Sequence, residues 1–143
     1  MQQQVLKSIL LVEDDIVDAM AVKRAFDHLH VTNELVHVIN GEEALDYLKN
    51  IDNVKPQIIL LDLNMPRMNG IEFMKIIKAD DNLKNIPVVI LTTSNAEQDR
   101  VQAFNLGIAG YIVKPVDHNN FIDMMSKIHQ YWEMTLFPES YYI

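Results

Sequence analysis

The stretch Ile58-Ile-Leu-Leu-Asp-Leu-Asn-Met-Pro66 shows the pattern that decides the fold. Its first four residues are apolar without polar alternation, which is typical of a strand buried on both faces of a parallel sheet. Four further short apolar runs occur, at residues 9–12, 35–39, 88–91 and 111–113. The sequence therefore predicts five strands, of which residues 58–61 form the third.

Stretches with helical spacing of apolar residues lie between and after these runs. They cover residues 16–29, residues 42–48 after an Asn40-Gly41 turn, residues 70–78, residues 97–106, and a last stretch from 117 towards 132. Strand and helix thus alternate five times, and right-handed crossovers convert that order into a parallel sheet. We expect a doubly wound α/β fold with helices on both faces and the flavodoxin-like strand order 2-1-3-4-5.

Length and charge limit the class of protein. The length of 143 residues predicts one domain. The chain is acidic, with 20 Asp plus Glu against 12 Lys plus Arg and a net charge of −8. This charge disfavours direct binding to nucleic acid and to anionic membranes. Because the chain shows neither a signal peptide nor an apolar run near the roughly 20 residues that span a bilayer, we expect a cytoplasmic protein.

Charged and hydroxyl side chains stand where the predicted strands end. Glu13 and Asp14 follow the first strand, Asp62 the third, Thr92 the fourth and Lys114 the fifth. In an open α/β sheet these ends meet at the edge where ligands bind. Each of these residues also has an ordinary explanation when it is considered alone. An acid at this place usually caps the next helix, as Asp15 would. A threonine is usually just a strand-end hydroxyl, and a lysine is usually a surface residue.

The joint placement of these side chains predicts a chemical site. Clustered carboxylates repel one another, and an all-oxygen set of donors suits a hard cation, so we expect Mg²⁺. An aspartate can accept a phosphoryl group as an aspartyl-phosphate, which makes Asp62 the candidate nucleophile. Mg²⁺, the Lys114 ammonium and the Thr92 hydroxyl would then stabilise the charge on the transferred group.

Four motifs resemble the receiver domains of two-component response regulators. They are Ser8-Ile-Leu-Leu-Val-Glu-Asp-Asp15, Leu61-Asp-Leu-Asn-Met-Pro66, Pro87-Val-Val-Ile-Leu-Thr92 and Gly110-Tyr-Ile-Val-Lys-Pro115. The resemblance covers residues 7–128 and leaves residues 129–143 as an aromatic extension of the single domain 1–143. It implies a signalling protein that accepts a phosphoryl group from a histidine kinase, and whose only catalysis is its own phosphorylation and dephosphorylation.

Each functional position of the family can be matched to one residue of this sequence. Asp62 matches the phosphorylated aspartate, Glu13 and Asp14 the acidic pair, Asn64 the residue whose backbone carbonyl binds the metal, and Thr92 and Lys114 the conserved hydroxyl and lysine of the switch. Asp14 would bind the metal directly. Glu13 stands where an aspartate is frequent, so we expect it to act through water. Pro115 implies a cis Lys114–Pro115 bond.

The resemblance also implies a switch and an output face. Tyr111 matches an aromatic residue that turns inward when the aspartate is modified; the alternative is a half-buried strand aromatic with its hydroxyl in water. The output face would comprise the fourth helix, the fifth strand and the fifth helix, at residues 97–132. Two arrangements of this face would have different affinities for a downstream protein.

The C-terminal segment gathers Tyr131, Trp132 and Phe137 into a short stretch. These residues either pack back on the fold or form the interface of a homodimer, where Trp and Tyr are favoured. The Tyr131-Trp132 pair, with Leu91-Thr-Thr-Ser94 and Lys114-Pro-Val-Asp117, also resembles the small regulators of cyanobacterial phytochrome kinases. A light-sensing histidine kinase would then be the phosphodonor. A helix-turn-helix domain that binds DNA would need a longer and more basic extension than this one, so we expect the protein to act through contact with another protein.

Two other classes of protein compete with this interpretation. Enzymes of the haloacid dehalogenase type also use an aspartyl nucleophile, but they need a second aspartate two residues later, where this chain has Asn64. An adaptor that has lost phosphorylation would show a damaged acidic site, and here the acids, Thr92 and Lys114 are all present.

Overall fold

The five predicted strands form one parallel sheet in the computed structural model, which describes residues 7–136. The elements in chain order are β1 (Ile9–Val12), α1 (Ile16–His28), β2 (Leu35–Val38), α2 (Gly41–Lys49), β3 (Ile58–Leu61), α3 (Gly70–Ala79), β4 (Val88–Thr92), α4 (Glu97–Asn105), β5 (Gly110–Val113) and α5 (His118–Met134). The strand order β2-β1-β3-β4-β5 confirms the predicted doubly wound α/β fold. None of the helices within residues 7–136 combines the length and apolar character needed to span a membrane.

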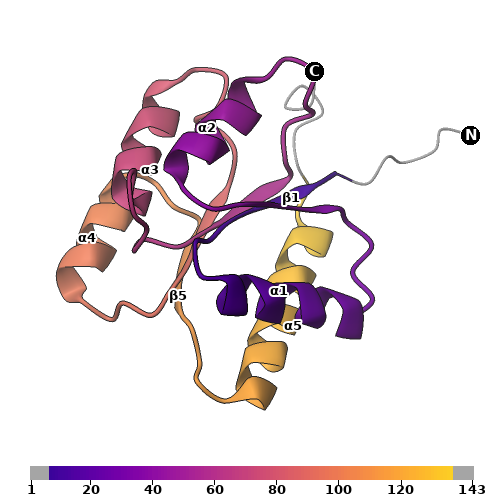
Figure 1. Ribbon diagram of the computed structural model, residues 1–143. Helices are drawn as coiled ribbons and strands as arrows, with labels where there is room; N and C mark the ends of the chain where they lie inside the picture. The colour runs from indigo at the N-terminus through magenta and orange to yellow at the C-terminus, as the bar shows by residue number, and fades with distance from the viewer. Residues whose placement is uncertain (1–6, 137–143) are drawn as a thin grey trace, which may run out of the picture.

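Two apolar layers sandwich the sheet, because successive residues of a strand point to opposite faces. Leu10, Val12 and Ile59 pack towards α2, α3 and α4, whereas Ile9 and Leu11 pack towards α1 and α5. Figure 1 shows the same division, with α2, α3 and α4 on one side of the sheet and α1 and α5 on the other. The predicted coverage of both faces is confirmed.

Burial on both faces holds for the inner strands β1, β3 and β4 but not for the edge strands. Three of the four residues of β2, and all of β5, are half-buried or exposed. An edge strand has a neighbour on one side only, so its side chains are less covered. The predicted strand at 35–39 accordingly ends at Val38, and Ile39 is exposed.

Side-chain caps determine where the helices begin. Asp15 accepts hydrogen bonds from the backbone N–H groups of Val17 and Asp18, which confirms its predicted cap. The Asn40-Gly41 pair is not a free turn, because Asn40 caps α2 and Gly41 is the first residue of that helix. Asparagine is frequent both in turns and at the position that caps a helix, so the dipeptide alone did not show which of the two it forms.

Tyr131 and Trp132 are neighbours on helix α5 but differ in their exposure to solvent. Trp132 is 2% exposed, and its ring centroid lies 5.8 Å from that of Phe26 on α1. Of the two alternatives left open for Trp132, the structure supports the one in which it packs back on the fold. Tyr131 is 42% exposed, and Phe137 lies outside the described residues.

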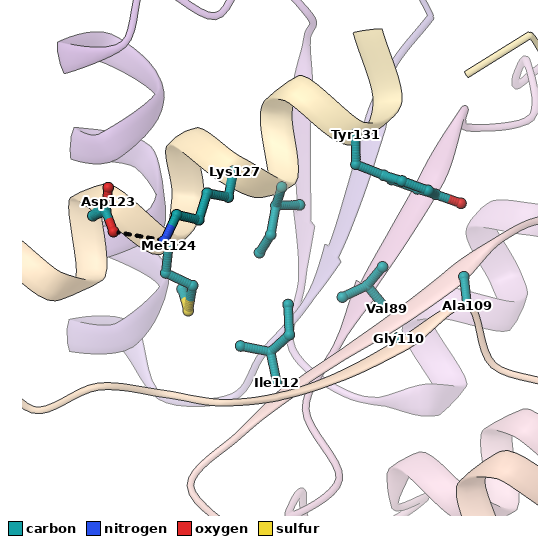
Figure 2. A pocket seen from close by; sticks show the side chains of 9 residues that line it. Val89, Ala109, Gly110, Ile112, Asp123, Met124, Lys127 and Tyr131 are labelled. Carbon is teal, nitrogen blue, oxygen red and sulfur yellow. Dashed lines mark ion pairs between the residues drawn. The ribbon is translucent and has the colours of Figure 1, made fainter. Parts of the chain in front are cut away.

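Tyr131 lines a hollow between α5 and the edge of the sheet. The hollow has a volume of about 410 Å³, and its lining includes Val89, Ile112 and Met124 (Figure 2). An ion pair between Asp123 and Lys127, at 3.1 Å, crosses the helix face beside it. The predicted output face thus carries an apolar hollow with a charged border.

Candidate functional site

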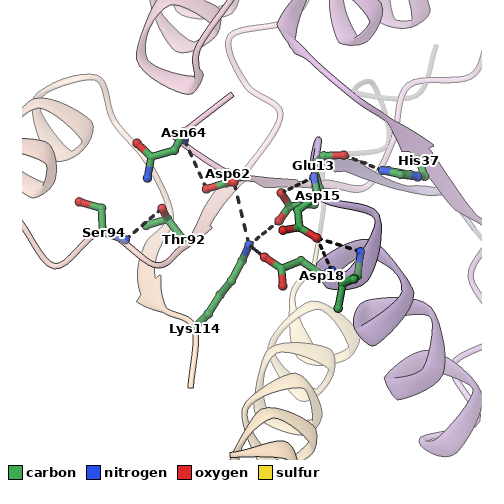
Figure 3. Close-up of polar contacts among 10 residues, drawn as sticks. Glu13, Asp15, Asp18, His37, Asp62, Asn64, Thr92, Ser94 and Lys114 are labelled. Carbon is green, nitrogen blue, oxygen red and sulfur yellow. Dashed lines mark hydrogen bonds and ion pairs between the residues drawn. The ribbon is translucent and has the colours of Figure 1, made fainter. Parts of the chain in front are cut away.

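The register of the sheet brings the strand-end side chains to one edge. Val12 pairs with Leu61 across β1 and β3, so the acids that follow them leave the sheet at the same level. Thr92 pairs with Val113 across β4 and β5, which places Lys114 just beyond the end of β4. The predicted convergence is confirmed, and Figure 3 shows Lys114, which follows β5, pointing towards Asp62 at the end of β3.

Three carboxylates form the centre of this edge. Glu13, Asp14 and Asp62 each offer an oxygen atom, and these atoms lie within 4.8 Å of one another. Glu13 is 2% exposed and Asp62 is also buried, whereas Asp14 is more open to solvent. Two negative charges about 4 Å apart repel by roughly 4 kcal/mol at an effective dielectric of 20, so the cluster requires positive charge.

Lys114 supplies one positive charge from within the site. Its Nζ donates to Glu13 Oε1 in a very short contact, donates to Asp18 Oδ2 at 2.8 Å, and lies 4.0 Å from Asp62 Oδ2. Burial alone would lower the pKa of the ammonium, but the hydrogen bonds that it donates to Asp18 and Glu13 and the nearby carboxylate charges outweigh this effect. The net pKa is raised, and Lys114 keeps its charge.

Glu13 is a buried carboxyl whose pKa lies well above its ordinary value. Burial raises the pKa of Glu13 to about 7 from 4.5, although its hydrogen bond and charge interaction with Lys114 lower it, and the charge of Asp62 raises it further. An all-oxygen donor set with uncompensated negative charge is the chemistry of a hard divalent cation site. The residues present therefore fit Mg²⁺ or Mn²⁺.

Backbone packing holds Asp62 in place. The backbone N–H of Asn64 donates to Asp62 Oδ1 at 3.4 Å, so the loop after β3 turns back over the carboxylate. Gly70 packs against the same loop: a Cβ there would lie 2.6 Å from the backbone oxygen of Asp62 and 2.8 Å from the Cα of Leu63. Only glycine lets the start of α3 approach so closely.

A chain of hydrogen bonds leads from Thr92 to the predicted output face. Thr92 is fully buried, and its Oγ1 accepts from the backbone N–H of Ser94 at 3.3 Å. Ser94 Oγ donates to Asp99 on α4, and the Tyr111 hydroxyl donates to the backbone oxygen of Ser94 at 3.0 Å. The Tyr111 hydroxyl is thus bonded within the protein rather than left in water.

The predicted cis Lys114–Pro115 bond is wrong for this structure, since the described part of the chain contains no cis peptide bond. The trans form is the more stable form of an X-Pro bond by about 0.5–1 kcal/mol. With the bond trans, Lys114 still reaches Glu13 and Asp18, so the inward direction of its side chain does not depend on the cis form.

Sequence reasoning missed two residues that contact the site. Asp18 binds Lys114 from the first turn of α1, and its place just after the acidic pair in the sequence did not identify this partner. The Nε2 atom of His37 lies 2.7 Å from the backbone oxygen of Glu13. A histidine inside an otherwise apolar strand was the signal there, but nothing in the sequence identified its partner.

Comparison with known proteins gives a consistent result. The family model of the response regulator receiver domain matches residues 9–126. A probable methanogenesis regulatory protein, FilR2 from Methanothrix harundinacea, is 36% identical over 87% of this chain and 82% of its own length. Response regulator Rcp1 from Synechocystis sp. is 34% identical over 91% of each chain.

Solved structures resemble the fold over nearly the whole chain. The phosphorylated cyanobacterial phytochrome response regulator RcpA superposes with a TM-score of 0.84 at 35% identity, covering 93% of this chain and 98% of its own. The Mn²⁺-bound form of Rcp1 superposes with a TM-score of 0.86 at 34% identity, covering 92% of this chain and 99% of its own.

Proposed function

This chain belongs to the response regulator receiver domains, and on that basis we propose that Asp62 accepts a phosphoryl group from a histidine kinase. The protein is a two-component signalling protein, and members of this family are typically phosphorylated on an aspartate. The observation that carries the proposal is the meeting of Glu13, Asp14 and Asp62 with Lys114 at one edge of the sheet.

Phosphoryl transfer needs a nucleophile and a positive environment for the moving group. An oxygen of the Asp62 carboxylate forms the new P–O bond, while the bond between phosphorus and the donor breaks and its electron pair stays with the leaving group. Lys114, which is 4.0 Å from Asp62, and the Thr92 hydroxyl would stabilise the three oxygens of the transferred group. Neither needs to lose a proton to do so.

The acidic cluster would hold the divalent cation of the reaction. Asp14 and Asp62 supply direct carboxylate ligands, Asn64 a backbone carbonyl, and Glu13 acts through water. When bound, Mg²⁺ neutralises the carboxylates and offsets the charge of the incoming phosphoryl group. The Mn²⁺-bound form of Rcp1 supports the assignment for this kind of protein.

The signal would leave the site through Thr92. Movement of its hydroxyl towards the phosphoryl group alters the contact with Ser94, whose backbone oxygen holds Tyr111 and whose side chain holds Asp99 on α4. These bonds link the site to α4 and β5, so phosphorylation changes the surface that a downstream protein meets. We infer that the downstream protein binds the face formed by α4, β5 and α5.

The donor would approach over α1 and the loop after β5. Ile16 and Val17 on α1 and Val116 after Lys114 are exposed beside the acidic cluster. Exposed apolar residues grouped at a reactive site indicate a protein contact. Because Rcp1 and RcpA are similar over most of the chain and RcpA is a phytochrome regulator, we infer that a phytochrome kinase is the donor.

A homodimer would use the hollow of α5 and β5. Tyr131 stands exposed at one end of this hollow, which Met124 and Ile112 also line (Figure 2). An aromatic residue at the border of an apolar hollow is a frequent anchor of protein interfaces. Phosphorylation would strengthen or weaken this contact through Tyr111 on β5.

The proposal is tested by incubation with Mg²⁺ and acetyl phosphate, followed by intact mass measurement and gel filtration. We expect one phosphoryl adduct on the wild type and on Asp46→Asn, which removes an exposed acid of α2, and none on Asp62→Asn or without Mg²⁺. A change of elution volume on phosphorylation would support the dimer. An adduct on Asp62→Asn, or none on the wild type, would refute the acceptor assignment.

A further inference from the structure

Lys114 is shared unequally among three carboxylates. Its Nζ contacts Glu13 most closely, Asp18 at 2.8 Å and Asp62 only at 4.0 Å. The acceptor proposed for the phosphoryl group is therefore the most distant of the three partners. Figure 3 shows the Lys114 side chain between the β3 end and the start of α1, with Asp18 beside it.

Asp18 is fixed in this place by the start of α1. Its backbone N–H donates to the capping carboxylate of Asp15 at 3.2 Å, and it stands in the first turn, where the helix dipole favours a negative charge. The Asp18 side chain is 37% exposed, whereas that of Lys114 is 7% exposed. Asp18 thus draws a buried ammonium towards the surface and away from Asp62.

We propose that Asp18 is a positioning residue that holds Lys114 in a resting place and competes with the phosphoryl group for its ammonium. The inference rests on the proposed phosphorylation of Asp62. Lys114 must approach the phosphoryl oxygens to stabilise them, and any approach that lengthens the Asp18 contact costs that hydrogen bond. Asp18 therefore slows phosphorylation.

Asp18→Asn removes the charge with little change of shape. We expect the rate of phosphorylation by acetyl phosphate to rise roughly twofold to fivefold, the size of a partly exposed charged contact. Asp18→Glu keeps the charge and should keep a rate near that of the wild type. Asp15→Asn is the matched control, because asparagine caps helices as well as aspartate does and the side-chain contacts of Lys114 are to Glu13, Asp18 and Asp62 rather than to Asp15.

A double-mutant cycle separates positioning from a general effect of charge. In a Lys114→Met background the Asp18→Asn change should alter the residual rate by less than about twofold, because the two side chains would no longer be coupled. A persistent increase there, or an equal increase in Asp15→Asn, would show that only the repulsion of the anionic donor has been relieved and would overturn the inference.

The outcomes also separate this inference from the function on which it rests. Absence of an adduct on the wild type would remove the proposed function itself. An adduct on the wild type with an unchanged rate in Asp18→Asn would leave that function intact and refute the role of Asp18. Thermal melting of each variant confirms that the rates compare folded proteins.

Discussion

Gly70→Ala provides a sharp test of how the fold positions Asp62. The added Cβ would lie 2.6 Å from the backbone oxygen of Asp62 and 2.8 Å from the Cα of Leu63, against the 3.4 Å at which ordinary contact begins. Both neighbours are backbone atoms, so the start of α3 or the loop after β3 must move. Such overpacking costs about 1–3 kcal/mol, and a loss of about 2 kcal/mol lowers the melting temperature by roughly 4–8 °C.

Gly41→Ala is the matched control for this change. Gly41 is likewise the first residue of a helix after a capping asparagine, but its added Cβ would meet the side chain of Met68, at 2.8 Å from Cγ. A methionine side chain is flexible and can turn away. We expect Gly41→Ala to change the free energy of unfolding by less than ~1 kcal/mol in urea denaturation.

The two variants should also differ in the proposed chemistry. At a temperature where both are folded, Gly70→Ala should take up the phosphoryl group from acetyl phosphate more slowly, because its Asp62 is displaced, whereas Gly41→Ala should match the wild type. Equal stability of the two variants, or an unchanged rate in a destabilised Gly70→Ala, would refute the reasoning.

Three further outcomes follow from the site and the C-terminal helix. Lys114→Met should lower the free energy of unfolding of the metal-free protein by about 3–5 kcal/mol, because it leaves buried carboxylates without their cation; a loss below ~1 kcal/mol in urea denaturation would contradict this. Burial raises the pKa of Glu13 from 4.5 to about 7. The folded protein therefore keeps a proton that the unfolded chain has released, so the contribution of Glu13 to stability falls as pH rises through this window. Mg²⁺ binding, which needs the ionised form, should correspondingly be weaker at about pH 6 than at about pH 8 by calorimetry, and equal affinities would contradict it. Trp132→Ala should cost about 3–5 kcal/mol of stability because its ring is buried, whereas Tyr131→Ala should cost less than ~1 kcal/mol; similar losses would show that both residues pack in the core.

The arrangement of the site also explains why the metal and the lysine act together. Three carboxylates whose oxygen atoms lie within 4.8 Å of one another face the Lys114 ammonium, so their negative charges outnumber its positive charge. A bound cation would remove this excess, so that Glu13 would compete less strongly with the phosphoryl group for the Lys114 ammonium.

Much of the fold could be predicted from local pattern. Apolar runs and helical spacing depend on the period of each element, and so β1 and β3 lie at the predicted residues and the strand order is as expected. The meeting of Glu13, Asp62 and Lys114 followed from the same pattern, because parallel strands bring their carboxyl ends to one edge.

The tertiary structure alone decided what depends on contacts between distant segments. The burial of Trp132 results from the packing of α5 on α1, and the sharing of Lys114 with Asp18 results from the distance between β5 and the start of α1. The sequence by itself determined which chemical groups stand at the strand ends, and packing decided which of them touch, since side-chain contacts depend on ångström-scale positions that periodicity does not encode.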